Sequence, residues 1–345
     1  CRQGLLNQVV NICLTSHVQS FQIRLWGSMK TENEAMSETF RTKASSINRA
    51  LDQIGDKWCL VILQEIFWGI RTFNELLNAS GMSRGVLSNR LKWLQKVDCL
   101  RKLVPPDNPR RPTYHLTTKS TEIYSLALMA TAWENRFFAH KGIRRLVLTH
   151  QVCQQTFTPQ LCCVKCDKEV QAKDVTYRPG PGFQLDDRAK KVRRRSSVET
   201  TLGPNSLNPY LNLIDIIGDR WTANVIALAY HGFKRFDQFH AELPIATNLL
   251  SDRLKYLANK DIFIPVPYQK KPVRYHYHLS EKGLAMFPFF IALLQWGDKW
   301  CSDETGAPVI TNHTPCQHDL FAVVRCSHCQ RDINPKEVTF EWIEH

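Results

Sequence analysis

The residues best suited to chemistry in this sequence are histidines and cysteines that occur twice in one spacing. The pattern is His-x2-Cys-x9-Cys-x2-Cys, and its members are His150, Cys153, Cys163 and Cys166, then His313, Cys316, Cys326 and Cys329. Two close pairs of soft ligands, joined by a loop that lets them converge, are typical of tetrahedral zinc. We therefore predict two zinc ions per chain, one held by each pattern. Four protein ligands leave no position for water, so the predicted role is structural.

Disulfides or redox switches are the alternative use of these paired thiols. Residues 1–28 show no signal-peptide pattern, and no run of apolar residues is long enough to span a membrane. We therefore expect a cytoplasmic, nucleoid-associated protein, and in a reducing compartment twelve cysteines indicate metal ligands before disulfides. The first methionine is Met29, and residues 1–46 are expected to be an extension that is disordered or partly artefactual.

An internal repeat organises the elements that position these ligands. Gly55-Asp56-Lys57-Trp58 recurs as Gly218-Asp219-Arg220-Trp221, and Trp133 recurs as Trp296. Both zinc patterns obey the same offset of 163 positions, without a gap. One offset shared by so many rare residues indicates a tandem duplication.

Each copy has the same predicted order of elements. In copy one, these are helices near Ile47–Gly55, Trp58–Phe67, Thr72 onward and Ser83–Val97, strands Leu100–Val104 and Thr113–Leu116, and a closing helix Lys119–Phe138. Ser83 is well placed as an N-cap, and prolines between the two strands predict a turn. Three helices, a two-stranded wing and a closing helix make a winged helix-turn-helix. The predicted fold class is mainly α with small β wings (α+β), in two tandem copies, each followed by a zinc-ribbon-like hairpin.

These elements predict the following domain boundaries. Winged-helix domains occupy residues 47–140 and 209–303, zinc-binding modules occupy 141–178 and 304–345, and a flexible basic linker occupies 179–208. The linker contains a Pro-Gly-Pro-Gly run and a block of like charges, a composition that cannot bury a core.

The chain carries a formal net charge of +13 with a pI of about 9.2, which suits a polyanionic partner such as DNA. The predicted recognition helices, residues 83–97 and 246–260, place small polar and basic side chains opposite an apolar face, as major-groove readers do. The helix before each of them and the wings add phosphate contacts. The predicted DNA-binding residues are Arg71, Thr72, Ser83, Arg84, Gly85, Ser88, Asn89, Arg90, Lys92, Arg110 and Arg111 in copy one, and Lys234, Arg235, Thr247, Asn248, Ser251, Arg253, Lys255, Lys270, Lys271 and Arg274 in copy two.

These motifs together resemble the HxlR-type winged-helix regulators. The resemblance rests on the run Leu51–Trp58, on Arg71-Thr72-Phe73-Asn74-Glu75-Leu76, on Leu87–Leu94, and in copy two on Leu279–Gly283 and Trp296–Trp300. It implies a bacterial transcription factor that is usually a homodimer on palindromic DNA, paired through its terminal helices. Here the two copies are expected to pair within one chain as a pseudo-dimer, which makes a second copy of the chain an optional partner.

The resemblance also directs attention to a cysteine near the first helices. Some members of the family respond to oxidants or electrophiles through such a residue, which makes Cys59 a candidate redox sensor. The alternative is a small buried core residue, as free cysteines commonly are.

Copy two departs from the family pattern at two positions. Ala246 stands where Ser83 provides an N-cap, and Asp252 places a negative charge on the DNA-facing side. We therefore expect a weaker or different half-site for copy two.

Two other classes of function stand beside a DNA-binding regulator. A zinc-bearing protein-interaction or RNA-binding module is compatible with the same elements. An enzyme is not expected, because the sequence shows no nucleophile–base pair, phosphate-cradling loop or open metal site.

Overall fold

The computed structural model describes residues 42–43, 45–106, 108–138, 145–183, 185–186 and 209–343. Most of the predicted N-terminal extension and of the predicted linker lies outside these residues. None of the described helices is long and apolar enough to cross a membrane.

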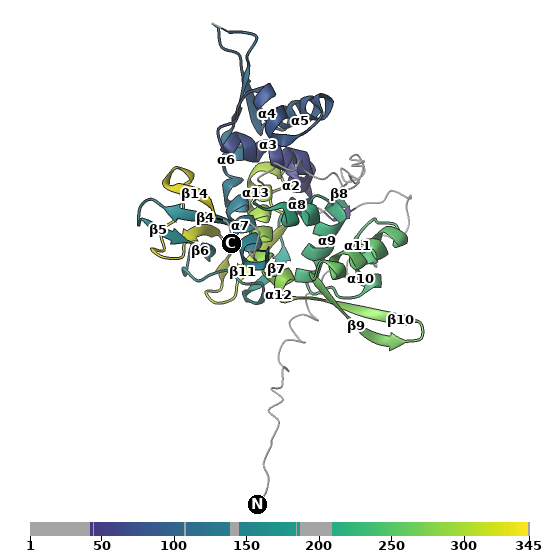
Figure 1. Ribbon diagram of the computed structural model, residues 1–345. Coiled ribbons are helices and arrows are strands. Elements are labelled where there is room, and N and C mark those ends of the chain that lie inside the picture. The colour runs from purple at the N-terminus through teal and green to yellow at the C-terminus, as the bar shows by residue number, and fades with distance from the viewer. Residues whose placement is uncertain are drawn as a thin grey trace, which may run out of the picture. The chain divides into compact units, whose positions relative to one another are not determined.

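Copy one forms the predicted winged helix-turn-helix (Figure 1). Its elements are α2 (Ser46–Ile54), α3 (Lys57–Phe67), α4 (Phe73–Ser80), α5 (Arg84–Lys96), β2 (Leu100–Leu103), β3 (Thr113–Leu116), α6 (Thr118–Thr121) and α7 (Tyr124–Phe138). Side chains start these helices where the sequence predicted: Ser83 accepts a hydrogen bond from the Val86 N–H, and Thr72 accepts one from Glu75. Gly69, just after α3, has a φ of 92°, a left-handed conformation that favours glycine.

Copy two repeats this order with one enlarged element. Its elements are α8 (Leu211–Ile217), α9 (Arg220–Tyr230), α10 (Phe236–Glu242), α11 (Thr247–Asn259), β9 (Phe263–Lys270), β10 (Val273–Leu279), α12 (Glu281–Leu284) and α13 (Phe287–Cys301). The wing β9–β10 is longer than β2–β3 and contains a bulge between Arg274 and Tyr275. The two wings therefore differ in reach although they occupy the same place in each copy.

The closing element is not the single helix predicted over Lys119–Phe138. It is divided into α6 and α7, and side chains of α6 bond to the segment between α5 and β2. The Ser120 hydroxyl donates to the Cys99 carbonyl at 2.5 Å, and the Lys119 ammonium donates to the Val97 carbonyl at 2.9 Å. The equivalent residues of copy two form the separate helices α12 and α13.

The two copies pack against each other through their closing and first helices, with pairs of contacts related by the repeat offset. The indole N–H of Trp133 donates to the Lys282 carbonyl, and that of Trp296 donates to the Lys119 carbonyl, each at 2.9 Å. Both tryptophans are almost fully buried. The same residues of each copy thus contact the other copy, as in a twofold interface.

Two ion pairs between the copies are also related by the repeat offset, and each joins the second helix of one copy to the first helix of the other. Lys57 lies 3.1 Å from Asp215, and the equivalent pair, Arg220 and Asp52, is 3.9 Å apart.

The approximate twofold relation is broken where α7 meets α8. The buried Glu134 carboxylate accepts hydrogen bonds from the Leu213 N–H and the Asn212 amide, and so caps the first turn of α8. Burial raises its pKa. The equivalent residue is Gly297, where a Cβ would collide with the Ser46 carbonyl. Glycine there lets α13 approach α2 closely.

The segments after the two winged helices are interlaced rather than separate. Their strands are β4 (Arg145–His150), β5 (Gln155–Phe157), β6 (Pro159–Cys163), β7 (Val175–Pro179), β11 (Val309–His313), β12 (His318–Asp319), β13 (Ala322–Cys326) and β14 (Val338–Ile343). The sheets are β14-β4-β5, β12-β11-β7 and β13-β6, so every sheet contains strands from both copies. The prediction of two independent zinc-ribbon-like hairpins is therefore wrong: only β4–β5 and β11–β12 pair within a copy.

The start of the predicted linker belongs to this interlaced body. The Gly180 N–H donates to the Pro308 carbonyl at 2.9 Å, and the Gly182 N–H donates to the Ala307 carbonyl at 3.1 Å. A side chain at Gly180 would collide with the Ala307 carbonyl. The Pro-Gly-Pro-Gly run thus continues the contact between β7 and β11, and β8 (Leu185–Asp186) then pairs with β1 (Thr42–Lys43).

A buried carboxylate between α2 and α13 makes stability depend on pH. Burial raises the pKa of Asp298 from 3.8 to about 6, although the Ser46 hydroxyl donates to it at 2.5 Å. The folded protein therefore holds a proton that the unfolded chain releases. We expect the free energy of unfolding to fall as pH rises from about 4 to 6, by at most about 3 kcal/mol.

The substitution Asp298→Asn removes the charge and keeps the acceptor for Ser46. Denaturant unfolding at several pH values should show this slope in the natural chain and a flatter profile in the variant. An unchanged slope in the variant would assign the pH dependence to other groups.

Candidate metal centres and nucleic-acid interface

The eight predicted ligands lie in two clusters, but each cluster draws on both copies. His150 and Cys153 lie with Cys326 and Cys329, while His313 and Cys316 lie with Cys163 and Cys166; within each cluster the ligand atoms are all within 4.8 Å of one another. The predicted ligand residues thus come together, whereas the predicted grouping, one complete pattern per cluster, is wrong. Strand pairing across the copies brings the His-x2-Cys turn of one copy to the Cys-x2-Cys turn of the other.

All four turns share one backbone geometry. The residue after the second ligand of each turn is left-handed, and its N–H donates to the carbonyl of the first ligand, as Gln154 does to His150 at 2.8 Å. The other three such residues are Asp167, Gln317 and Gln330. Each turn therefore directs two ligand side chains to the same side.

The separations fit the edges of a tetrahedron around zinc. Zn–S bonds of about 2.3 Å and Zn–N bonds of about 2.0 Å place ligand sulfurs about 3.8 Å apart, and a sulfur and a nitrogen about 3.5 Å apart. Cys153 and Cys326 have their sulfurs 3.9 Å apart, and the Cys153 and Cys329 sulfurs lie 3.5 and 3.3 Å from His150 Nδ1. A disulfide needs sulfurs about 2.05 Å apart. The described cysteines are all free thiols in this structure.

The other cluster has nearly the same dimensions. Its Cys163 and Cys316 sulfurs are 3.9 Å apart, and His313 Nδ1 lies 3.3 Å from Cys166 and 3.4 Å from Cys316. Three thiols and one imidazole are a donor set that zinc prefers, and a set of four leaves no coordination position open.

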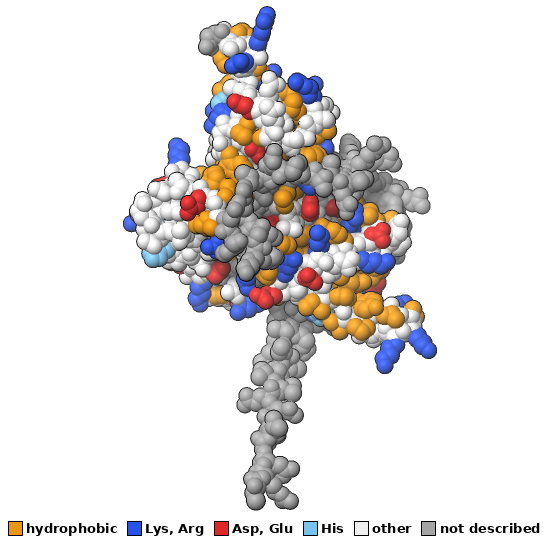
Figure 2. All heavy atoms as spheres, in the orientation of Figure 1, with side chains coloured by type: hydrophobic (Ala, Val, Ile, Leu, Met, Phe, Trp, Pro, Cys, Tyr) orange, Lys and Arg blue, Asp and Glu red, His pale blue; other side chains and the backbone are white. Residues whose placement is uncertain are grey.

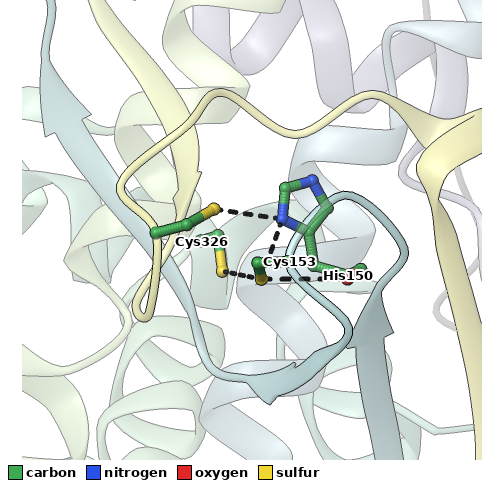
Figure 3. A group of neighbouring side chains, drawn as sticks. His150, Cys153 and Cys326 are labelled. Carbon is green, nitrogen blue, oxygen red and sulfur yellow. Dashed lines mark hydrogen bonds between the residues drawn. The ribbon is translucent and has the colours of Figure 1, made fainter.

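Figure 3 shows the first cluster, in which His150, Cys153 and Cys326 point toward one another from loops of different copies. The His150 ring is fully buried and turns Nδ1 to the thiols. Its Nε2 has no hydrogen-bond partner among the described residues, and the Glu337 carboxylate lies 4.0 Å away. In metal sites, a ligating imidazole commonly has a carboxylate near its other nitrogen, which orients the ring and makes it a stronger ligand. The sequence pattern alone did not indicate Glu337, which lies on the other copy.

Each cluster pairs a thiol of raised pKa with one of lowered pKa. Burial raises the pKa of Cys163 and Cys326. The Arg331 backbone N–H lowers the pKa of Cys329. Burial also acts against ionisation of Cys316, but hydrogen bonds from His313 and the His318 backbone lower its pKa to about 6. Each cluster therefore contains a thiol that loses its proton readily, and metal ligation requires the thiolate.

The second candidate site is the outward face of α5. Leu87, Leu91 and Leu94 are buried under this helix, as the apolar spacing predicted. The opposite side is open to solvent, with Ser83, Arg84, Gly85, Asn89 and Lys92 exposed and Ser88 half-buried. The face is therefore not packed against its own domain.

Copy two presents the same face on α11. Thr247, Asn248, Asp252 and Lys255 are exposed, and Ser251 is half-buried. Ala246 occupies the N-cap position, and no side chain caps this helix. Both departures noted in the sequence are thus at the surface that corresponds to the α5 face.

Two of the predicted DNA-binding residues, Arg90 and Arg253, form ion pairs within their own copy. Arg90 makes a bidentate ion pair with Asp56, at 2.8 and 2.9 Å, and the equivalent Arg253 forms an ion pair with Asp219 in copy two. Both aspartates also cap the following helix, α3 or α9. These arginines therefore hold the recognition helix against its neighbour, and their predicted contacts with DNA remain a prediction. The repeated Gly-Asp-Lys/Arg-Trp motif was the available signal for this bond.

The backbone N–H groups before α4 and α10 are also occupied. Glu75 accepts from the Thr72 N–H at 3.1 Å, and Gln238 accepts from the N–H groups of Lys234 and Arg235 at 3.0 Å each. These N–H groups are thus already bonded within the chain, so the predicted phosphate contacts of this segment would come from side chains. Arg71 stays exposed beside His115, and the Arg235 guanidinium pairs with Asp237.

The wing tips carry the predicted cations. Arg110 and Arg111 are exposed between β2 and β3, and Lys270, Lys271 and Arg274 are exposed at the end of β9–β10. Figure 2 shows Lys and Arg side chains at the tip of the β9–β10 hairpin, with hydrophobic side chains along its length.

Cys59, the candidate sensor, is fully buried in α3. This position favours the alternative of a small core residue, because oxidants act on exposed thiolates.

Comparison with known proteins identifies the winged helices. A model of the HxlR-like helix-turn-helix family matches residues 53–141 and 216–305, together 179 of 345 residues. An uncharacterized HTH-type transcriptional regulator of Mycobacterium tuberculosis, Rv3095, is 32% identical over 144 residues, which are 42% of this chain and 91% of the relative. The HTH-type transcriptional regulator YodB of Bacillus subtilis is 30% identical over 99 residues, 28% of this chain and 88% of the relative.

Proposed function

Because this chain belongs to the HxlR-like helix-turn-helix family, we propose that it is a transcriptional regulator that reads double-stranded DNA in a sequence-specific manner. The observation that carries the proposal is the exposed polar face of α5, repeated on α11. Relatives described as transcriptional regulators support it.

The two recognition helices occupy major grooves in this proposal. Asn89 and Lys92 are exposed on α5 and can bond to base edges, since asparagine pairs with adenine and lysine with guanine. Asn248 and Lys255 are their counterparts on the face of α11. The cations at the wing tips contact the backbone or the minor groove and supply affinity without sequence preference.

The paired contacts between copies support a pseudo-dimer within one chain. A homodimer offers two identical DNA-binding domains to a palindrome. Here the two DNA-binding domains belong to one polypeptide and differ in sequence. Asp252 repels phosphate, and the uncapped start of α11 lacks a stabilisation of about 1 kcal/mol. The operator is therefore asymmetric, with the stronger half-site under copy one.

Zinc occupies both Cys/His clusters in this proposal. The donor set, the separations and the closed coordination support structural zinc, which stabilises the interlaced segment and takes no part in a reaction.

Selection of bound duplexes from a random pool tests this function. We expect an asymmetric consensus whose binding survives moderate salt and competitor DNA. Asn89→Ala should weaken binding to that site by about tenfold, because a good bidentate contact contributes about 1–3 kcal/mol of discrimination. The double variant Arg110→Ala/Arg111→Ala should weaken binding to all sequences and reduce the salt slope by about 2.

Lys336→Ala, which removes an exposed charge from the interlaced segment, is the control and should change neither quantity. Binding that collapses with salt and shows no consensus would contradict the proposal and favour an RNA-binding or protein-interaction module. A perfect palindrome would contradict the unequal half-sites alone.

A further inference from the structure

The ladder between β6 and β13 connects the two metal clusters. Its register pairs Leu161 with Val324, which are equivalent positions of the two copies, so the approximate twofold axis passes between them. Cys163 at the end of β6 belongs to one cluster, and Cys326 at the end of β13 belongs to the other. One pair of strands therefore carries a ligand of each site.

An ion pair makes a second connection. Arg325, next to the ligand Cys326, donates to Asp167, next to the ligand Cys166 of the other cluster, at 2.5 Å. It also donates to Asp332 at 2.9 Å, and its own side chain is only 14% exposed. The turns of the two clusters are thus held in place by one guanidinium.

Neither cluster can form while the segments of the two copies are apart. Each ion needs a His-x2-Cys turn from one copy and a Cys-x2-Cys turn from the other. The first ion that binds must therefore bear the entropic cost of interlacing both segments. The same interlacing brings together all four ligands of the second cluster, so the second ion binds to a site that is already formed.

We propose that the two clusters load their metal ions as one cooperative unit, a clamp that fastens the two copies of the chain to each other. The proposal rests on the zinc assignment made above. It adds that the bound ions help to hold the two recognition helices in one arrangement, since β4 and β11 are the next strands in the chain after the closing helices α7 and α13. The Gln295 amide joins these parts, donating to and accepting from the Ala322 backbone at 3.0 Å.

Native mass spectrometry of the metal-stripped full chain, given one zinc ion per chain on average, tests the coupling. Chains without zinc and chains with two ions should dominate. Independent sites of equal affinity would put roughly half of the chains in the one-zinc form, and that outcome would overturn the proposal.

A variant that keeps all eight ligands provides the matched comparison. Arg325→Gln removes the ion pair with Asp167, and the one-zinc fraction should rise toward the statistical value. In the double variant Cys153→Ser/Cys329→Ser, which disables one cluster, chelator competition should show at least tenfold weaker zinc binding at the other. Unchanged affinity there would also overturn the proposal.

These results are separable from the proposed function. The zinc measurements need no DNA. If the two zinc ions bind independently in a chain that binds its operator, only the clamp is contradicted. If zinc binds cooperatively in a chain that binds no DNA, only the proposed function as a regulator is contradicted. A chain that takes up no zinc overturns both the clamp and the zinc assignment.

Discussion

Replacing Cys153 and Cys329 together with serine should leave one zinc ion per chain, whereas replacing Cys153 and Cys166 together should leave none. The first pair belongs to one cluster and leaves all four ligands of the other in place, while the second pair removes one ligand from each. Loss of one of four ligands removes most of the affinity of a structural zinc site. Metal analysis of purified protein measures the outcome directly.

The two variants are closely matched, because each loses Cys153 together with the second cysteine of a Cys-x2-Cys turn. If each zinc pattern closed on itself, the results would be reversed, with none left in the first variant and one in the second. Cys162→Ser is the control, since Cys162 is buried beside Cys163 but lies in neither cluster. It should keep two ions.

Trp296→Ala should lower the free energy of unfolding by about 3–5 kcal/mol, the usual cost of removing a large buried aromatic ring. The ring is 4% exposed, and the Lys119 ammonium lies 5.6 Å from its centre. Its loss also leaves the Lys119 carbonyl without the indole donor. Denaturant unfolding, monitored on the zinc-loaded chain, measures the effect.

Trp296→Phe separates the ring from its N–H group. It keeps most of the buried surface and loses only the hydrogen bond, so its cost should be about 1–3 kcal/mol. Trp133→Ala, at the equivalent position, should resemble Trp296→Ala. A loss below about 1 kcal/mol in both alanine variants would show that the contact between the copies contributes little to stability.

Local chemistry made most of the winged helix predictable. Helix starts follow from side chains that satisfy free N–H groups, as Thr72 and Ser83 do, and the end of α3 follows from glycine at a left-handed position. The buried face of α5 follows from leucines at helical spacing. These features depend on neighbours within a few positions, which a sequence shows directly.

Side-chain partners within the domain were harder to foresee. Arg90 lies on a helix whose other polar residues face solvent, and its partner Asp56 is 34 positions away. A guanidinium is long enough to reach either a DNA backbone or a neighbouring helix. Helical periodicity places the Cα of Arg90 on one face of the helix but does not determine where its guanidinium group lies.

By itself, the sequence determined that the chain is a tandem repeat, that each copy is a winged helix and which eight residues are the candidate metal ligands. Tertiary structure alone decided how those ligands are grouped. The Cys-x2-Cys turns of the two copies offer the same two ligands at the same spacing, so either can complete the tetrahedron begun at His150. Pairing of β4 with β14 and of β6 with β13 selects the turn from the other copy, because strand register is set by contacts between segments more than 150 residues apart.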